Sequence, residues 1–250
     1  MADESNDPRW TEIEHLPQWD EEFYSIYTAK KYGKWVMLKT LRPEYKDEPK
    51  YREMIEKEFL VRYNLAHPNI VMINDYEDIP GLGRCIITDD VYGESLREII
   101  DSGKLTEHHL SQICHQMVSA LSYIQTNHVV HHPIRPQSII FTENVGNLKL
   151  IDVGFDQKNS LTPTDVSDDI YNYGLVLREV LDRMGSRNSM LRYIANKCID
   201  PDPSHRFKSV EDLRMAIEGR SFKKVYLIVI AFLTVMVILL IILNHKLLAV

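Results

Sequence analysis

The sequence predicts an α+β fold of two unequal lobes, followed by one apolar segment near the C-terminus. Segments rich in β-branched and aromatic residues, with one helical segment among them, occupy the first third of the chain. Helical periodicity dominates from Ser95 on, and an uncharged apolar run extends from Val225 to Leu243. Strands grouped ahead of helices are typical of an α+β arrangement. A chain of 250 residues suffices for one large core or two small lobes.

The smaller lobe is predicted from four strands and one helix. Residues 1–16 are polar and acidic, and they are expected to form a flexible N-terminus. Four later segments have the composition of strands: residues 23–29, 35–41, 70–75 and 84–89. Gly33 indicates a turn between the first two strands. The apolar spacing in residues 47–66 is typical of a helix.

The larger lobe is predicted to be mainly helical. Apolar residues at helical spacing mark five helices, over residues 95–101, 106–127, 169–184, 189–199 and 208–218. Two short apolar segments, residues 139–142 and 148–152, flank a polar turn and predict a hairpin. The folded domain is therefore expected to span residues 17–219.

The run from Val225 to Leu243 predicts a transmembrane helix. Its nineteen residues carry no charge, and a helix of that length spans roughly 28 Å, close to a bilayer's hydrocarbon core. A buried core helix is the alternative, but core helices of this length ordinarily carry a polar face. Three basic residues precede the run: Arg220, Lys223 and Lys224. The positive-inside rule then predicts a single-pass membrane protein with a cytoplasmic domain and a short tail, residues 244–250.

The net charge limits the kinds of partner that are expected, and the cysteines indicate the redox state of the compartment. A net charge of −7 disfavours nucleic acid as a partner, because phosphate binding needs clustered lysine and arginine. Cys85, Cys114 and Cys198 form no CxxC pair, so they are expected to be small packing residues in a reducing compartment. The polar N-terminus has no apolar region typical of a cleaved secretory signal.

Several short motifs, in their order along the chain, resemble those of protein kinases. Residues 131–140 read HHPIRPQSII and are similar to the family's catalytic loop. Further similarities are VMLK ending at Lys39, Glu58 ahead of HPNIV, the DVG that begins at Asp152, DIYNYG from Asp169 and CIDPDPSHR ending at Arg206. Residues 17–219 are therefore identified as a degenerate member of the protein kinase-like superfamily. The resemblance implies a small β-rich N-lobe and a mainly helical C-lobe.

The sequence departs from the family where phosphate transfer takes place. Pro133 stands where the family's Asp accepts the proton of the substrate hydroxyl, and Ser138 stands where its Asn holds magnesium. Proline has no acid or base, and a serine hydroxyl is a poor substitute for an amide oxygen. The segment between Gly154 and Asp169 is short and has no APE-like motif. Arg206 therefore needs another partner, for which Asp165 and Asp168 are candidates.

The sequence also departs from the family at the positions that contact the nucleotide. The positions of the family's phosphate-loop glycines fall on Trp19, Glu21 and Tyr24, and Glu21 puts negative charge where phosphates would lie. Met37 replaces the small residue over the adenine and is expected to fill part of that pocket.

Three residues remain as candidates for a nucleotide site: Lys39, Glu58 and Asp152. The alternative is that Lys39 and Glu58 only brace the helix against the sheet. A lone carboxylate at Asp152 is a poor magnesium site, so ATP and magnesium are disfavoured and no cofactor is expected. Metal binding is not expected at the histidine pairs that begin at His108 and His131. His131 is expected to have a structural role, while Ser160, Thr162 and Thr164 could be phosphorylated.

The departures together predict a catalytically inactive kinase-like protein, a pseudokinase, and not an enzyme. Its work would be that of a scaffold or allosteric regulator of a protein partner at the cytoplasmic face of a membrane. Two alternatives retain nucleotide binding. One is a nucleotide-gated switch that does not hydrolyse its ligand, and the other is an atypical ATP-binding protein kinase that uses Lys39 and Asp152.

Overall fold

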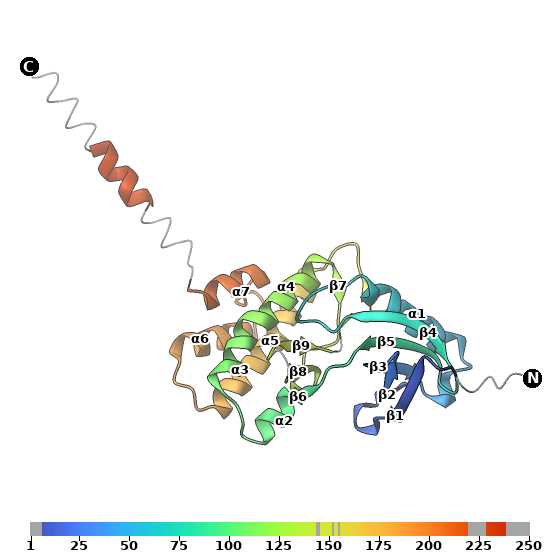
Figure 1. The fold of residues 1–250 in the computed structure, drawn as a ribbon. Helices are drawn as coiled ribbons and strands as arrows, with labels where there is room; N and C mark the ends of the chain where they lie inside the picture. Colours follow the sequence, from blue (N-terminus) through green and yellow to red (C-terminus); the bar gives the residue numbers. More distant parts are fainter. Residues whose placement is uncertain (1–6, 144–145, 152, 155, 220–228, 239–250) are drawn as a thin grey trace, which may run out of the picture.

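The computed structural model describes residues 7–143, 146–151, 153–154, 156–219 and 229–238. These residues form two lobes, a sheet with one helix at one end and a helical body at the other (Figure 1). The N-lobe comprises β1 to β5 and α1, and the C-lobe comprises β6 to α7. The predicted two-lobe α+β arrangement is confirmed.

The N-lobe is built on a five-stranded antiparallel sheet with strand order β1-β2-β3-β5-β4. Its strands are β1 (Trp10–His15), β2 (Tyr24–Lys31), β3 (Lys34–Leu41), β4 (Ile73–Ile79) and β5 (Gly83–Asp89). The predicted turn between β2 and β3 is present, with positive φ at Tyr32 (52°) and Gly33 (82°). Two consecutive residues with positive φ match the right-handed twist of the flanking strands, which favours a tight hairpin.

Strand β1 lies within the segment that was expected to be flexible. It pairs antiparallel with β2, and its first residue, Trp10, is buried against Ala29 and Val36. The other residues of β1 are exposed, and Glu12 pairs with Lys30 on β2 at 2.8 Å. The buried Trp10 side chain and the backbone hydrogen bonds to β2 therefore hold this strand, which its polar composition did not predict.

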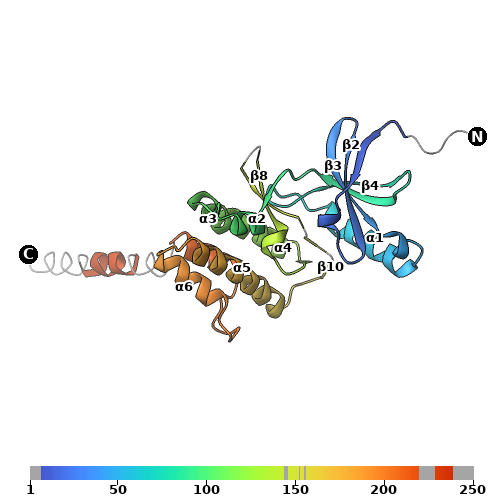
Figure 2. The same ribbon diagram turned by 90° about the horizontal axis from the view of Figure 1, so that it is seen from below.

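Helix α1 (Pro49–Tyr63) packs across one face of the sheet (Figure 2). Its buried side chains are Ile55, Glu58, Val61 and Arg62. Ile55 joins Leu41 and Ile86 of the sheet in one apolar cluster. Because residues four apart share a helix face, Glu58 and Arg62 are both directed inward.

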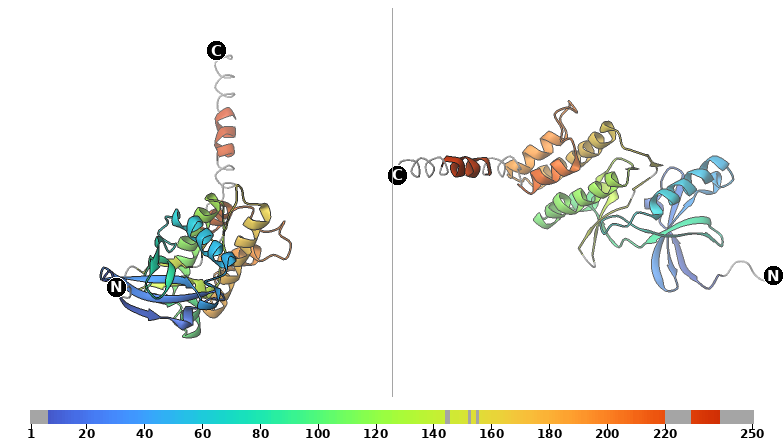
Figure 3. Two further views of the ribbon diagram at one scale, coloured as in Figure 1. Left: turned by 90° about the vertical axis from the view of Figure 1, so that its right-hand side faces the viewer. Right: turned by 90° about the horizontal axis from the view of Figure 1, so that it is seen from above.

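The C-lobe is mainly helical, as predicted. Its elements are α2 (Leu96–Asp101), α3 (Glu107–Gln112), a π-helical turn (Ile113–Met117), α4 (Val118–Thr126), α5 (Pro163–Arg183), α6 (Ser189–Cys198) and α7 (Val210–Ile217). Helices α6 and α7 lie at the end of the molecule away from the N-lobe (Figure 3). The three cysteines are buried, and burial raises the pKa of Cys114 to about 11. Packing roles for these cysteines fit that burial.

Helix α5 begins six residues before its predicted start at residue 169. Thr162 caps it by accepting a hydrogen bond from the Asp165 backbone, and the Asp165 carboxylate in turn accepts from the Thr162 backbone. Pro163 occupies the first helical position, where its missing N–H costs nothing. The capping signal T-P-x-D was present in the sequence but lacks the apolar periodicity on which the prediction relied.

Short strands flank the loops that carry the motifs from His131 and before Asp152. Strands β6 (Gly93–Ser95), β8 (Ile139–Thr142) and β9 (Leu148–Leu150) form one sheet, in which the predicted hairpin pairs β8 with β9. Strand β7 (Val129–Val130) pairs with β10 (Asp156–Gln157). Residues 131–138 therefore run from β7 to β8, and Ile151 directly follows β9.

The predicted transmembrane run and tail fall largely outside the described residues. Residues 229–238 are described, and they are helical and exposed. Among the helices that the structure describes, none has both the length and the apolar character needed to cross a bilayer.

Candidate functional site

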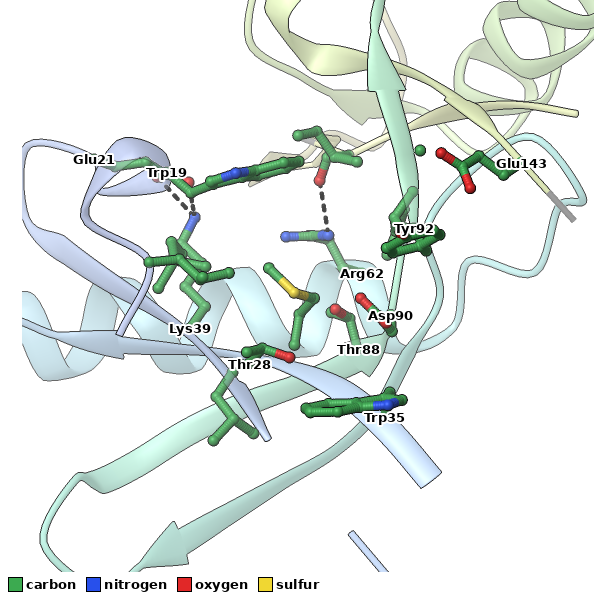
Figure 4. Close-up of a pocket in the computed structure, with 18 residues that line it drawn as sticks. Trp19, Glu21, Thr28, Trp35, Lys39, Arg62, Thr88, Asp90, Tyr92 and Glu143 are labelled. Atoms are coloured by element: carbon green, nitrogen blue, oxygen red, sulfur yellow. Dashed lines mark hydrogen bonds and ion pairs between the residues drawn. The ribbon is translucent and has the colours of Figure 1, made fainter. Parts of the chain in front are cut away.

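A cleft of about 790 Å³ lies between the two lobes (Figure 4). The N-lobe side is lined by Trp19, Glu21, Met37 and Lys39, and the segment after β5 contributes Asp90 and Tyr92. Drug-sized ligands typically occupy cavities of about 300–1,000 Å³. The cleft is therefore large enough for an organic ligand of nucleotide size.

Lys39 lines this cleft and pairs with Glu58, as predicted. Strand β3 carries Lys39 and helix α1 carries Glu58, and the Lys39 Nζ lies 3.2 Å from Glu58 Oε1. Both side chains are about nine-tenths buried. Burial alone would raise the pKa of Glu58, but Lys39 and Arg62 hold it below its usual value. The glutamate is thus an anion that fixes the lysine relative to the helix.

Arg62 adds a second cation that the sequence analysis did not identify. Its Nη1 donates to Glu58 Oε1 at 2.6 Å, and its Nη2 donates to the Ile151 carbonyl at 3.2 Å. Arg62 lines the cleft and ties α1 to the segment just before Asp152 (Figure 4). The spacing of four residues from Glu58 was a readable signal, because such pairs are neighbours on a helix.

Glu21 also contacts Lys39. Its two carboxylate oxygens lie 2.8 and 3.1 Å from the Lys39 Nζ, which also lies 4.1 Å from the centre of the Tyr24 ring. Glu21 comes from the loop between a short 3-10 helix (Pro17–Trp19) and β2. The sequence analysis predicted negative charge in this place, and the structure directs that charge at the lysine.

Other side chains that line the cleft are aromatic or aliphatic. Met37 lines it, as predicted, together with Trp35 and Tyr92. Met37 pairs with Thr88 across the sheet, and the small threonine also lines the cleft. Burial raises the pKa of Asp90, which lies beside them. These walls fit a flat heteroaromatic group, and the cleft remains open despite Met37.

The two degenerate loop positions do not line the cleft. Pro133 is exposed and borders a separate pocket of about 290 Å³. The Ser138 hydroxyl donates to the Arg135 carbonyl at 3.0 Å and accepts from the Arg135 N–H at 3.2 Å. The serine therefore closes its own turn, and Asp152 lies outside the described residues.

His131 anchors this loop, in agreement with its expected structural role. Its Nδ1 lies 2.7 Å from the His132 carbonyl, and its Nε2 lies 2.9 Å from Asp169 Oδ1 on α5. The His131 side chain is only 1% exposed. Among the described residues, no three His, Cys, Asp or Glu side chains are grouped closely enough to hold a metal ion.

Arg206 has one of its two expected partners. Its Nη1 lies 3.9 Å from Asp168 and within 3.2 Å of the Ser167 hydroxyl. Asp165 instead pairs with Lys158 at 2.9 Å. The first turns of α5 therefore bind Arg206 in a chain without an APE-like motif.

Comparisons with known proteins agree with this geometry. A profile of the protein kinase domain matches residues 22–173, more than half of the chain. The chain is 32% identical over 135 residues to serine/threonine-protein kinase 36 of Pongo abelii, which covers 53% of this chain and 10% of that protein. It is 29% identical over 198 residues to serine/threonine-protein kinase PknD of Mycobacterium tuberculosis, covering 77% and 29%. The chain thus spans less than a third of the length of these relatives.

A solved structure shows the same fold. The kinase domain of Mycobacterium tuberculosis PknI superimposes with a TM-score of 0.65 at 17% identity. The match covers 88% of this chain and 100% of that domain.

The expectation that this chain is not an enzyme is wrong. The similar curated proteins are named serine/threonine-protein kinases. That expectation rested on four departures together: the missing base, the missing magnesium-binding Asn, the missing phosphate-loop glycines and the short segment without an APE-like motif. Phosphoryl transfer, however, depends mainly on positioning and on stabilisation of charge. With the domain profile matched over most of both lobes, the chain belongs to the protein kinase domain family.

Proposed function

We propose that this chain is an ATP-binding protein kinase with an atypical catalytic loop. The observation that carries the proposal is that Lys39, which pairs with Glu58 at 3.2 Å, lines a cleft of about 790 Å³. Serine/threonine kinases among its relatives support a protein hydroxyl as the phosphate acceptor.

The residues present fit a nucleotide in this cleft. Lys39 would pair with the phosphates, since Glu58 holds its ammonium group. The base would lie between Met37, Trp35 and Tyr92. Asp152 is the position that would hold magnesium. When bound, magnesium would neutralise charge that develops on the phosphates.

An atypical loop is compatible with slow transfer. The transition state of phosphoryl transfer is loose, so most catalysis comes from alignment and from charge stabilisation. A general base contributes about 10²–10⁴-fold. Pro133 therefore lowers the expected rate without removing the contribution of Lys39.

A membrane anchor is a further part of the proposal. The uncharged run from Val225 to Leu243 and the basic residues ahead of it support a single-pass protein with a cytoplasmic kinase domain. Anchoring would confine the domain to a plane and raise its effective concentration toward protein partners in that membrane. Replacing Leu233 and Leu239 by Arg should move the full chain from the membrane fraction to the soluble fraction. Unchanged membrane retention by that variant would contradict the anchor.

Nucleotide binding and transfer by the full chain in detergent micelles test the kinase proposal. Because a ligand of the folded state raises the melting temperature, ATP with magnesium should give a saturable shift. Lys39→Ala should abolish that shift. Slow incorporation of labelled phosphate into the chain or into a generic acceptor protein should accompany binding. Saturable binding without any transfer would indicate a nucleotide-gated switch, and no shift at millimolar ATP would contradict both.

A further inference from the structure

The Glu21 side chain occupies the face of Lys39 that is directed into the cleft. Both of its carboxylate oxygens lie within 3.1 Å of the Lys39 Nζ, at 2.8 and 3.1 Å. Figure 4 shows the two contacts at the rim of the cleft, beside Trp19. A carboxylate with two oxygens on one ammonium group resembles a phosphate in charge and in hydrogen bonding.

Glu21 adds a second carboxylate to Lys39, beside that of Glu58. With Glu21 in place, an incoming phosphate would be repelled by this carboxylate. With Glu21 displaced, one negative charge less would lie beside the lysine, and the phosphate would be attracted more strongly.

The two glutamates on Lys39 differ in how firmly they are held. The Glu58 side chain is 9% exposed, and it is bound by both Lys39 and Arg62. The Glu21 side chain is 40% exposed and projects from a loop. Partly exposed ion pairs of this kind contribute little to stability, so Glu21 can be exchanged for a ligand whereas Glu58 is fixed.

The loop itself does not depend on the Glu21 carboxylate. Asp20 holds the loop, because its carboxylate accepts from the Ile26 N–H at 2.9 Å and contacts His15 Nε2 at 3.0 Å. Glu21 contributes a backbone hydrogen bond, from its N–H to the Tyr24 carbonyl at 3.0 Å. The side chain can therefore turn toward solvent while the loop keeps its course.

We propose that Glu21 is an internal competitor for the phosphate position on Lys39. Nucleotide enters when the Glu21 side chain turns out to solvent, and the return of that side chain excludes nucleotide. This inference rests on the proposed nucleotide-binding function and adds regulation to the same site. Bulky and acidic residues in place of phosphate-loop glycines then restrain binding and do not abolish it.

Glu21→Gln and Glu22→Gln form a matched pair for testing this competition. Each substitution removes one negative charge from the same loop, but Glu22 is exposed and is not among the residues that line the cleft. The dissociation constant for ATP with magnesium, measured on the full chain in micelles, should fall about 3- to 10-fold for Glu21→Gln. It should change less than about 2-fold for Glu22→Gln. Equal or weaker binding by Glu21→Gln would overturn the inference while leaving the proposed function intact.

Labelling of Lys39 gives a readout that does not depend on nucleotide. A small amine-reactive ester should modify Lys39 faster in Glu21→Gln than in Glu22→Gln, as measured by mass spectrometry of the peptide. Equal labelling rates would show that Glu21 does not cover the lysine and would overturn the inference. Failure of wild type and both variants to bind ATP would instead overturn the proposed function, and this inference with it.

Discussion

The two sides of the cleft have diverged to different extents. On the N-lobe side, Lys39 and Glu58 form the lysine–glutamate pair by which the family holds its phosphate-pairing lysine. On the C-lobe side, Pro133 is exposed and Ser138 closes its own turn. Under the proposed function, nucleotide binding and phosphate transfer would depend on different segments of the chain, so a change in one segment does not imply loss of the other.

The N-lobe side carries further charged contacts. Arg62 pairs with Glu58, and Glu21 pairs with Lys39. The C-lobe side keeps its scaffold, with His131 held by Asp169, while its chemical groups have changed. The N-lobe side thus has a cluster of paired charges around Lys39. On the C-lobe side, the loop is held in place by His131, but the side chains at positions 133 and 138 differ from those of the family.

Removal of Glu58 should have the largest effect on stability. Glu58→Ala leaves Lys39 and Arg62 buried without their shared anion, which typically costs about 3–5 kcal/mol. Chemical denaturation monitored by fluorescence would measure the loss. The control is Glu56→Ala on the exposed face of the same helix, which should cost less than about 0.5 kcal/mol. Similar costs for both variants would show that the cluster does not support the N-lobe.

Restoration of a base should have the next largest effect. Pro133→Asp places a carboxylate where the family's proton acceptor stands, and it should raise the rate of phosphate transfer about a hundredfold. Pro133→Asn is the matched control, because it has the same shape without the base. Equal rates for the two variants would mean that loop position, and not the missing carboxylate, limits transfer.

Much of the fold was predictable because its segments carry local signals. The strands from β2 on have β-branched and aromatic composition, and most C-lobe helices have apolar periodicity. Strand β1 lacked such a signal, since only Trp10 of its six residues is buried. It is held by pairing with β2, which is a tertiary interaction that composition does not reveal.

The parts of the candidate site that belong to short sequence motifs could be predicted. Lys39 and Glu58 were paired correctly from their motifs, and Met37 was correctly assigned to the cleft. The contact of Glu21 with Lys39 depends on the course of a loop that has lost its glycines, so no motif could define it. The sequence analysis took the missing base, the missing magnesium-binding Asn, the missing phosphate-loop glycines and the short segment before Asp169 together as loss of activity, and that conclusion was wrong.

The pH dependence of stability tests whether the charge of Glu58 stabilises the fold. The pKa of Glu58 is lowered in the folded state, so its stabilising contribution is fully present above the ordinary glutamate pKa of about 4.3. This contribution is lost as the pH falls through the lowered pKa that Glu58 has in the folded state. The melting temperature of wild type should therefore exceed that of Glu58→Gln at neutral pH, and the gap should narrow below about pH 4. A gap that is constant with pH would assign the effect to packing.

The smallest effect is expected on the C-lobe side, at the cap of α5. Thr162→Ala removes the side chain that accepts the Asp165 N–H, and loss of such a cap typically costs about 1 kcal/mol. Thr164→Ala, two residues later on an exposed position, is the control and should be nearly neutral. Denaturation curves of the two variants give the difference. Because Asp165 and Asp168 lie on the turns that this cap begins, a clear loss for Thr162→Ala would indicate that a local cap holds α5 in place beside Arg206. No difference between the variants would mean that the packing of α5 against α6 fixes those turns without the cap.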